Sequence, residues 1–245
     1  MSDMSNISKI SVDPSERYLS LRADPHSSFG YGLMRRTQAL LSTIDAYAPP
    51  ASDLRVVDFG CADGAMLAAV AAHLGERFSS GLGLDVFRAG IPTGIADNRI
   101  EFIATDLFKH YPFPILDASV DIVIASAFFK HHPEPIKFLG EVARVLKPGG
   151  LVVLTDPRPL VVRIGCRIGR FNPEYNPNIW SLSTVNRFLQ QNRIHLKINS
   201  FKRYWIAPTS TLYRLGVEKI IPDFIGQGIA LHQCLTMLKL DGAKY

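Results

Sequence analysis

The chain has 245 residues, of which 47% are hydrophobic and 20% are charged, and its formal net charge is +5. This composition excludes a predominantly disordered chain, and three widely spaced cysteines exclude a disulfide-stapled fold. We expect a cytoplasmic protein, because the first thirty residues contain no apolar signal segment and no stretch approaches the ~18 consecutive apolar residues of a membrane-spanning helix.

From residue 31 to residue 156 the sequence alternates between predicted helices and predicted strands. Apolar residues at helical spacing predict helices over residues 31–47, 65–74 and 135–146. Short apolar runs predict strands over residues 54–59, 80–85, 100–106, 120–126 and 151–156. Near-continuous apolar strands that alternate with helices are typical of a parallel sheet covered on both faces. We therefore predict an α/β fold built on a doubly wound sheet with helices on both faces.

After residue 157 the predicted elements are less regular. Helices are predicted over residues 160–169, 183–191 (with Ser183 as the N-cap) and 212–221, and residues 171–180 are an Asn/Pro-rich loop. Two further strands are predicted over residues 195–205 and 229–240. The sheet is therefore expected to have seven strands, most of them parallel.

A turn rich in small residues joins the first predicted strand to the following helix. Gly60, Ala62 and Gly64 stand two residues apart, and Asp58 stands two residues before the first glycine. Small residues at a helix N-terminus let a polar or anionic ligand approach the backbone. A dinucleotide fingerprint would place its third small residue five positions after the first, so the spacing argues against a nicotinamide-dependent oxidoreductase. The carboxylate of Asp58 would instead suit an ammonium group, as in an amino-acid moiety.

Five segments in chain order resemble motifs of the class I, Rossmann-like S-adenosylmethionine-dependent methyltransferases. The first is the small-residue turn, where Val56-Val57-Asp58-Phe59-Gly60-Cys61-Ala62-Asp63-Gly64 resembles D/E-x-G-x-G-x-G. The other four are Asp85 after the second strand, Thr105-Asp106-Leu107 after the third, Ser126 to Pro135 with His131-His132-Pro133-Glu134-Pro135 after the fourth, and Glu141 to Gly150, which resembles R-x-L-K-P-G-G. The resemblance covers residues 54–156. One departure is Ala62, where the family has glycine.

The resemblance implies S-adenosyl-L-methionine as the cofactor. It implies that the cofactor-binding residues are Asp58, Gly60, Cys61, Ala62, Gly64, Asp85, Val86, Asp106, Leu107 and Ser126. In that family the acidic residue at the position of Asp85 binds the ribose, and two carboxylate oxygens can accept both hydroxyl protons. Residues 1–50 would form an N-terminal helical segment or lid, and residues 51–245 a single methyltransferase domain. Its cofactor half would be residues 51–156 and its acceptor-shaping half residues 157–245.

Catalytic residues are less well defined by the sequence. Methyl transfer requires the acceptor to be held in line and in some cases deprotonated, and His131 is a candidate general base. The alternative is that His131 caps its loop or packs beside the cofactor, and His132 is expected to be a loop residue. Phe29, Tyr31 and Arg35 are candidates for the lid, with plain helix packing as the alternative. Cys61 is expected to be a small filler, and no metal is expected, because the cysteines and histidines lack ligand spacing.

The charge distribution bears on the acceptor. Residues 1–156 carry a net −4 and residues 157–245 a net +9. Aromatic and basic residues after residue 157 would suit a small-molecule acceptor with an apolar body and an anionic part. A lipid-like molecule is one such acceptor. The aromatic and basic residues are Tyr175, Trp180, Tyr204, Trp205, Tyr213, Arg158, Arg163, Arg167, Arg170 and Arg203. Residues 160–169 could also make a peripheral membrane contact, and a solvated basic surface is the simpler reading.

Two other functions stay open. No DNA partner is expected, because Ser126-Ala127-Phe128-Phe129 stands where amino-methylating DNA enzymes have an Asn/Asp-Pro-Pro segment, and there is no Pro-Cys pair. An RNA methyltransferase fits less well than a small-molecule enzyme, although the basic third leaves it open. A catalytically silent cofactor-binding or regulatory protein on the same fold is the remaining alternative.

Overall fold

The structure is a computed structural model that describes residues 20, 24, 28–86, 97–169, 172–204 and 231–240. Its helices, with the 3-10 turns labelled η, are α2 (Ser28–Tyr47), α3 (Ala65–Leu74), η1 (Gly75–Arg77), η2 (Phe129–His131), α4 (Pro135–Val145), α5 (Pro159–Arg167), η3 (Pro173–Tyr175) and α6 (Leu182–Gln191). Its strands are β1 (Leu54–Phe59), β2 (Phe78–Asp85), β3 (Ile100–Ala104), β4 (Val120–Ser126), β5 (Leu146–Pro157), β6 (Leu196–Tyr204) and β7 (His232–Lys239). The helix predicted over residues 212–221 lies outside the described residues.

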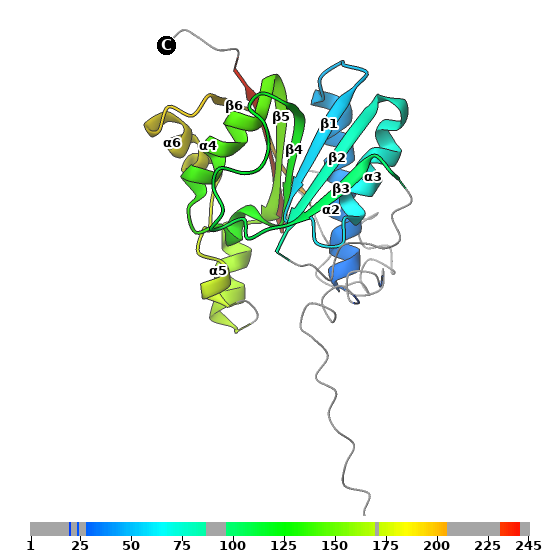
Figure 1. Cartoon of the computed structure of the whole chain (residues 1–245). Coiled ribbons are helices and arrows are strands. Elements are labelled where there is room, and N and C mark those ends of the chain that lie inside the picture. The colour runs from blue at the N-terminus through cyan, green and yellow to red at the C-terminus, as the bar shows by residue number, and fades with distance from the viewer. Residues whose placement is uncertain are drawn as a thin grey trace, which may run out of the picture.

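The seven strands form one sheet in the order β3-β2-β1-β4-β5-β7-β6 (Figure 1). Strands β1 to β5 pair in parallel, whereas β7 runs antiparallel to both β5 and β6. The predicted fold class, a mostly parallel seven-stranded sheet with helices on both faces, is confirmed. Strand β1 lies between β2 and β4, so the chain reverses its direction of progress across the sheet at this point. Ligands of open α/β sheets bind beyond the carboxyl ends of the strands at such a switch point.

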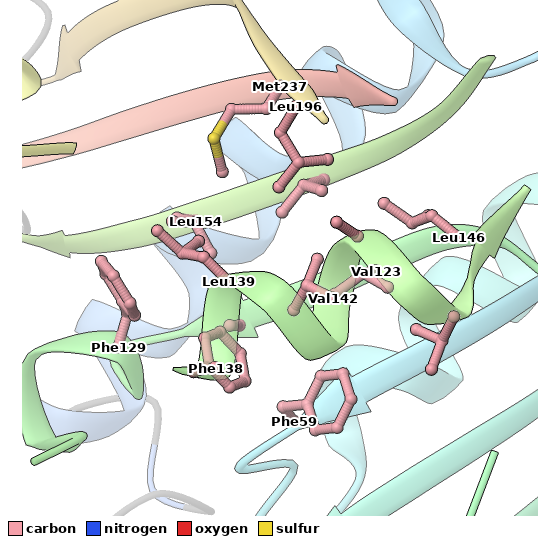
Figure 2. Packing of buried hydrophobic residues seen from close by; sticks show 14 of the residues in the cluster. Phe59, Val123, Phe129, Phe138, Leu139, Val142, Leu146, Leu154, Leu196 and Met237 are labelled. Atoms are coloured by element: carbon pink, nitrogen blue, oxygen red, sulfur yellow. The ribbon is translucent and has the colours of Figure 1, made fainter. Parts of the chain in front are cut away.

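Both faces of the sheet are buried at its centre, which explains why β1, β4 and β5 are apolar along most of their length, whereas the edge strands β3 and β6 are partly exposed. Residues alternate between the two faces, so Val56 packs with helices α2 and α3 while Val57 packs on the side of α4 and α6. Figure 2 shows the second of these layers, where Phe138 and Val142 of α4 lie against the strands. The core therefore holds the carboxyl ends of the strands in fixed positions.

The R-x-L-K-P-G-G segment has a structural role. The guanidinium group of Arg144 donates to the carbonyl oxygens of Phe113 and Ile115, at 3.1 and 2.8 Å, and fixes the loop before β4. The ammonium group of Lys147 lies 2.8 Å from the carboxylate of Asp121 on β4. Through these contacts the R-x-L-K-P-G-G segment, which joins α4 to β5, also holds the loop before β4 and the β4 strand itself.

Several predicted boundaries differ from the structure by a few residues, and two of them have a clear physical reason. Strand β5 begins at Leu146, not at residue 151, because Leu146 already pairs with Val120 before a register shift accommodates the following glycines. Helix α6 is capped by Ser181, whose hydroxyl accepts a hydrogen bond from the Thr184 amide at 3.2 Å, and not by Ser183. Both serines are suitable caps, and burial of the apolar side of α6 selects the earlier one. Among the helices of the described residues, none combines the length and apolar character required to cross a membrane.

Candidate cofactor and acceptor site

The small-residue turn wraps tightly around the carboxyl end of β1. Gly60 and Gly64 have positive φ angles of 75° and 70°. The Gly60 amide donates to the carbonyl oxygen of Leu84 at 2.8 Å, which joins the turn to β2. A Cβ atom on Gly60 would lie 2.5 Å from the ring of Phe128. Glycine is therefore required here both by the backbone conformation and by the close approach of the Phe128 ring.

Ala62 and Asp85 meet across the gap between β1 and β2. The Ala62 amide donates a hydrogen bond to Oδ2 of Asp85 at 2.8 Å. Ala62 has φ +51°, a conformation that costs a non-glycine residue about 1–2 kcal/mol. Asp58, on β1 just before the turn, is only 2% exposed. The structure thus brings the predicted ribose-binding carboxylate directly against the small-residue turn.

The thiol of Cys61 lies inside this turn. Burial raises the pKa of Cys61, and the negative charges of Asp58 and Asp85 raise it further. A Cβ atom on Gly83 of β2 would lie 2.9 Å from the Cys61 sulfur. Since a buried thiol of raised pKa is a poor nucleophile, Cys61 fills space in the turn.

The segment after β3 is fixed mainly by its own contacts. Oδ1 of Asp106 accepts a hydrogen bond from the Phe108 amide at 3.0 Å, which lowers the pKa of Asp106, and Lys109 lies 3.1 Å from its other oxygen. Leu107 is buried in the core. The ring of Phe108, 38% exposed, stacks on Phe128 with 5.9 Å between the ring centres. Sequence reasoning missed this aromatic pair, which joins the Asp106 segment to Gly60.

Ser126 and Val86 mark the carboxyl ends of two other strands. The Ser126 hydroxyl lies 2.8 Å from the Thr155 hydroxyl of β5. Val86, directly after Asp85, has 58% of its surface exposed. All the residues predicted to bind the cofactor therefore stand at or beside the carboxyl edge of β1 to β4.

His131 is oriented by a backbone contact. Its Nδ1 atom hydrogen-bonds the carbonyl oxygen of Tyr175, so Nδ1 carries the proton and Nε2 has the lone pair. Burial lowers the pKa of His131 to about 4, with a further contribution from the positive charge of Lys130. His131 is consequently neutral at pH 7 and able to accept a hydrogen bond or a proton at Nε2.

His132 lies in the loop between η2 and α4, as predicted, but its side chain is buried. Its exposed fraction is 0%. Nδ1 accepts a hydrogen bond from the Glu134 amide at 3.1 Å, and Nε2 lies 2.5 Å from the hydroxyl oxygen of Tyr111. Burial lowers the pKa of His132. Its position between Tyr111 and the start of α4 accounts for a histidine in this segment without a catalytic role.

Sequence reasoning also missed a buried charge pair. Asp156, at the end of β5, is 0% exposed and accepts hydrogen bonds from Nε1 of Trp180 at 2.8 Å and from the Lys130 amide at 3.1 Å. The Lys130 ammonium group lies 3.5 Å from the other oxygen. Burial raises the pKa of Asp156 and lowers that of Lys130. The available signal was an acidic residue at the end of a strand, as at Asp85.

Trp180 was predicted to be one of the aromatic residues that receive the acceptor, and this was wrong. It is 1% exposed and packs on Phe129 in the core, because its indole N–H needs the buried carboxylate of Asp156. Tyr175, in contrast, is 70% exposed. Arg170, Trp205, Tyr213 and the side chain of Phe29 lie outside the described residues.

Two further basic or titratable groups lie near the Lys130–Asp156 pair. Burial lowers the pKa of His232, at the start of β7, to about 3, and the positive charges of Arg36 and Lys130 lower it further. The ring of Tyr204 lies 5.7 Å from that of His232. Positive charge from Arg36 on α2 and from Lys130 on η2 thus acts on His232.

The side chains of two of the three residues predicted to form a lid are described on α2. The side chain of Tyr31 is only 1% exposed, and the guanidinium group of Arg35 donates a hydrogen bond to the side-chain oxygen of Gln38.

A cavity of about 940 Å³ opens beside this region, between α5, the start of α6 and β6. Of the described residues that line it, four are basic and none is acidic: Arg158, Arg163, Lys202 and Arg203. Elsewhere in the described parts of the chain, no three His, Cys, Asp or Glu side chains gather as metal ligands would.

Comparisons with known proteins agree with this geometry. Residues 57–154 match the family model for a methyltransferase domain. This stretch is a class I S-adenosylmethionine-dependent methyltransferase domain. The resemblance seen in the five motifs is therefore confirmed, and enzymes of this family use S-adenosylmethionine.

Three similar proteins illustrate the range of this family. The chain is 40% identical over 134 residues to a demethylmenaquinone methyltransferase of Clavibacter sepedonicus, covering 50% of each chain. It is 30% identical over 146 residues to a ribosomal protein L11 methyltransferase of Hydrogenovibrio crunogenus, covering 58% of this chain and 45% of the other. An S-adenosylmethionine-dependent methyltransferase from Mesorhizobium loti has the same fold, with a TM-score of 0.61 and 17% identity over 81% of this chain and 96% of its own. The chain spans about half the length of the curated relatives it matches.

Proposed function

We propose that this chain transfers a methyl group from S-adenosylmethionine to a small-molecule acceptor that carries an anionic or ionisable group. The observation that carries the cofactor half is the contact of Asp85 with Ala62, within a methyltransferase domain. A turn without bulky side chains and two nearby carboxylates fit a cofactor that carries a positive sulfonium and an ammonium group.

The cofactor would be held mainly by the edge of β1, β2 and β4. Asp85 would accept hydrogen bonds from the ribose hydroxyls, and Asp58 would pair with the ammonium group. The turn under the cofactor would consist of Gly60, Cys61, Ala62 and Gly64. The remaining residues proposed to hold the cofactor are Val86, Asp106, Leu107 and Ser126. Bound there, the cofactor supplies an electrophilic methyl group, and the protein's own task is to position the acceptor.

The proposal that the acceptor is anionic rests on positively charged side chains at the carboxyl edge of the sheet. Arg36 and Lys130 both lower the pKa of His232 through their positive charge, and the same positive potential would favour an anionic oxygen of the acceptor beside this histidine. The described part of the chain offers no hydrogen-bond partner to the buried Nδ1 atom of His232, which leaves a polar atom for the acceptor. The basic cavity adds room for an anionic or bulky part.

His131 would accept the acceptor's proton at Nε2 where the acceptor needs to lose one. With a pKa of about 4 it is a weak base at neutral pH, because general bases work best with a pKa near the operating pH. We therefore assign the larger part of acceptor activation to the positive charges of Lys130 and Arg36. They favour the ionised form of the acceptor before the methyl group is transferred.

The parts of the chain on either side of the cofactor-binding half would contact the acceptor. Residues 1–50, including Phe29, Tyr31 and Arg35, would form the lid, and residues 157–245 would shape the acceptor pocket. One relative is named for a quinone acceptor, which agrees with an acceptor that has an apolar body and an ionisable oxygen. Another is named for a ribosomal protein, so a protein acceptor is the alternative to test.

Two measurements test this function. Calorimetric titration with S-adenosylmethionine and S-adenosylhomocysteine should show binding, and no binding at high micromolar concentration would reject the proposal. Cell extract with labelled methyl donor should then yield label in a small organic molecule. Label in protein or RNA would replace the proposed acceptor class, and binding without any turnover would favour a catalytically silent protein.

A further inference from the structure

Helix α5 and the residue after it, Ile168, expose an apolar stripe, and Leu160 of this stripe also lines the basic cavity. Leu160, Ile164 and Ile168 follow one another at intervals of four residues and are 59%, 49% and 68% exposed. The residues that α5 buries are Val162 and Gly165, on another side of the helix. Three large aliphatic side chains in one row are an unusual use of surface, because each gains about 1.5–3 kcal/mol when fully buried.

Positive charge flanks this stripe. Arg163 and Arg167, both exposed, stand one residue before Ile164 and one residue before Ile168. From Pro157 to Pro173 the sequence contains four arginines and no acidic residue. An apolar row bordered by arginines, whose long side chains can reach the headgroups, is the pattern of a helix that lies in a membrane interface.

The position of α5 fits such a contact. It follows the carboxyl end of β5 directly, and Figure 1 shows it extending away from the sheet at the edge where the small-residue turn lies. The basic cavity described above is lined by Arg158 and Arg163 from the same part of the chain. The apolar stripe, the arginines and the cavity therefore share one side of the molecule.

We propose that α5 docks this protein on the surface of an anionic lipid bilayer. Leu160, Ile164 and Ile168 enter the boundary between headgroups and acyl chains, and Arg163 and Arg167 contact anionic headgroups. Docking would place the carboxyl edge of the sheet next to the bilayer. The interaction does not depend on methyl transfer, so it stands or falls separately from the proposed function.

Flotation of the full chain with lipid vesicles tests this. Wild-type protein should float with vesicles of phosphatidylcholine and about one-third phosphatidylglycerol, and much less with pure phosphatidylcholine. R163Q/R167Q should weaken binding roughly 30-fold, at about one factor of five per arginine. L160S/I164S/I168S should weaken it at least about tenfold, and raising salt from about 50 to about 500 mM should weaken wild-type binding.

Matched controls separate α5 from general surface effects. Leu116→Ser removes a leucine that is 79% exposed on the loop before β4, and R187Q/R193Q removes two exposed arginines from α6 and the turn after it. Both should bind vesicles as wild type does, and circular dichroism should show all variants folded.

Three outcomes would overturn the proposal. The first is absence of wild-type flotation with anionic vesicles, and the second is equal binding by the α5 variants and the controls. The third is a wild-type dimer in light scattering that L160S/I164S/I168S converts to a monomer, without vesicle binding by the wild type. That result would assign the stripe to a second copy of this chain.

Discussion

The carboxylate of Asp85 accepts a hydrogen bond from the amide of Ala62 across 2.8 Å, although the two residues are 23 positions apart. The contact joins two segments whose motifs are separate in the sequence. It also means that Asp85 stabilises the turn in addition to the role proposed for it in binding ribose. A substitution test must separate these two contributions.

Asp85→Asn makes that separation. The asparagine side-chain oxygen can still accept from Ala62, while one acceptor oxygen and the negative charge are lost. Because hydrogen bonds to charged groups contribute about 1.5–3 kcal/mol, affinity for S-adenosylhomocysteine should fall about 10- to 100-fold by calorimetry. Asp45→Asn, at a carboxylate that pairs with His73 on the exposed side of α2, should keep wild-type affinity. Equal affinity of both variants would reject the ribose assignment.

Gly60→Ala should destabilise the fold more than the same change at Gly149. The two glycines have nearly equal φ angles of 75° and 74°, so both alanines bear the left-handed cost of about 1–2 kcal/mol. Only at Gly60 does the new methyl group meet the Phe128 ring, at 2.5 Å, whereas nothing lies within 4 Å at Gly149. Overpacking should add about 1–3 kcal/mol to the loss of unfolding free energy in urea. Similar losses at both positions would contradict this packing account.

Trp180→Phe should weaken the fold through Asp156. The phenyl ring keeps most of the apolar contact, but the buried carboxylate loses the indole N–H donor. Removing one partner of a buried hydrogen bond costs about 1–3 kcal/mol, measurable by urea denaturation. In the Asp156→Asn background the same change should cost less, because the partner charge is gone. An unchanged cost in the double variant would show that the hydrogen bond is not the source of the effect.

Acidification should lower the stability of the fold because three histidines are buried in neutral form. The pKa of His131 is lowered from 6.5 to about 4 by burial and by Lys130, so below pH 6.5 the unfolded chain binds a proton that the folded chain does not. Stability therefore falls as the pH drops from about 6.5 to about 4, with burial lowering the pKa of His132 and His232 in the same direction. Thermal melts across this range should show a shallower decline for His131→Gln than for wild type. Identical slopes would place His131 in a more solvated environment than the structure does.

Sequence reasoning was most successful where a local signal exists. The strands at residues 54–59 and 120–126 and the helix at residues 65–74 have the predicted bounds, because apolar runs and helical spacing are legible within a short window. The small-residue turn and Asp85 were also found as motifs, and their position at one edge follows from parallel pairing of β1 and β2. Boundaries next to glycine and serine pairs, as at Leu146 and Ser181, were placed less well.

The sequence by itself thus determined the fold class, the family and the edge of the sheet at which the cofactor is proposed to bind. Only the tertiary structure decided that β7 inserts antiparallel between β5 and β6, and that Trp180 and Lys130 converge on Asp156. The physical reason is that periodicity reports on local burial, whereas the periodicity of neither segment specifies which residues will pair across 24 or more positions. The net charge of +5 likewise became informative only when folding gathered arginines around one cavity and along α5.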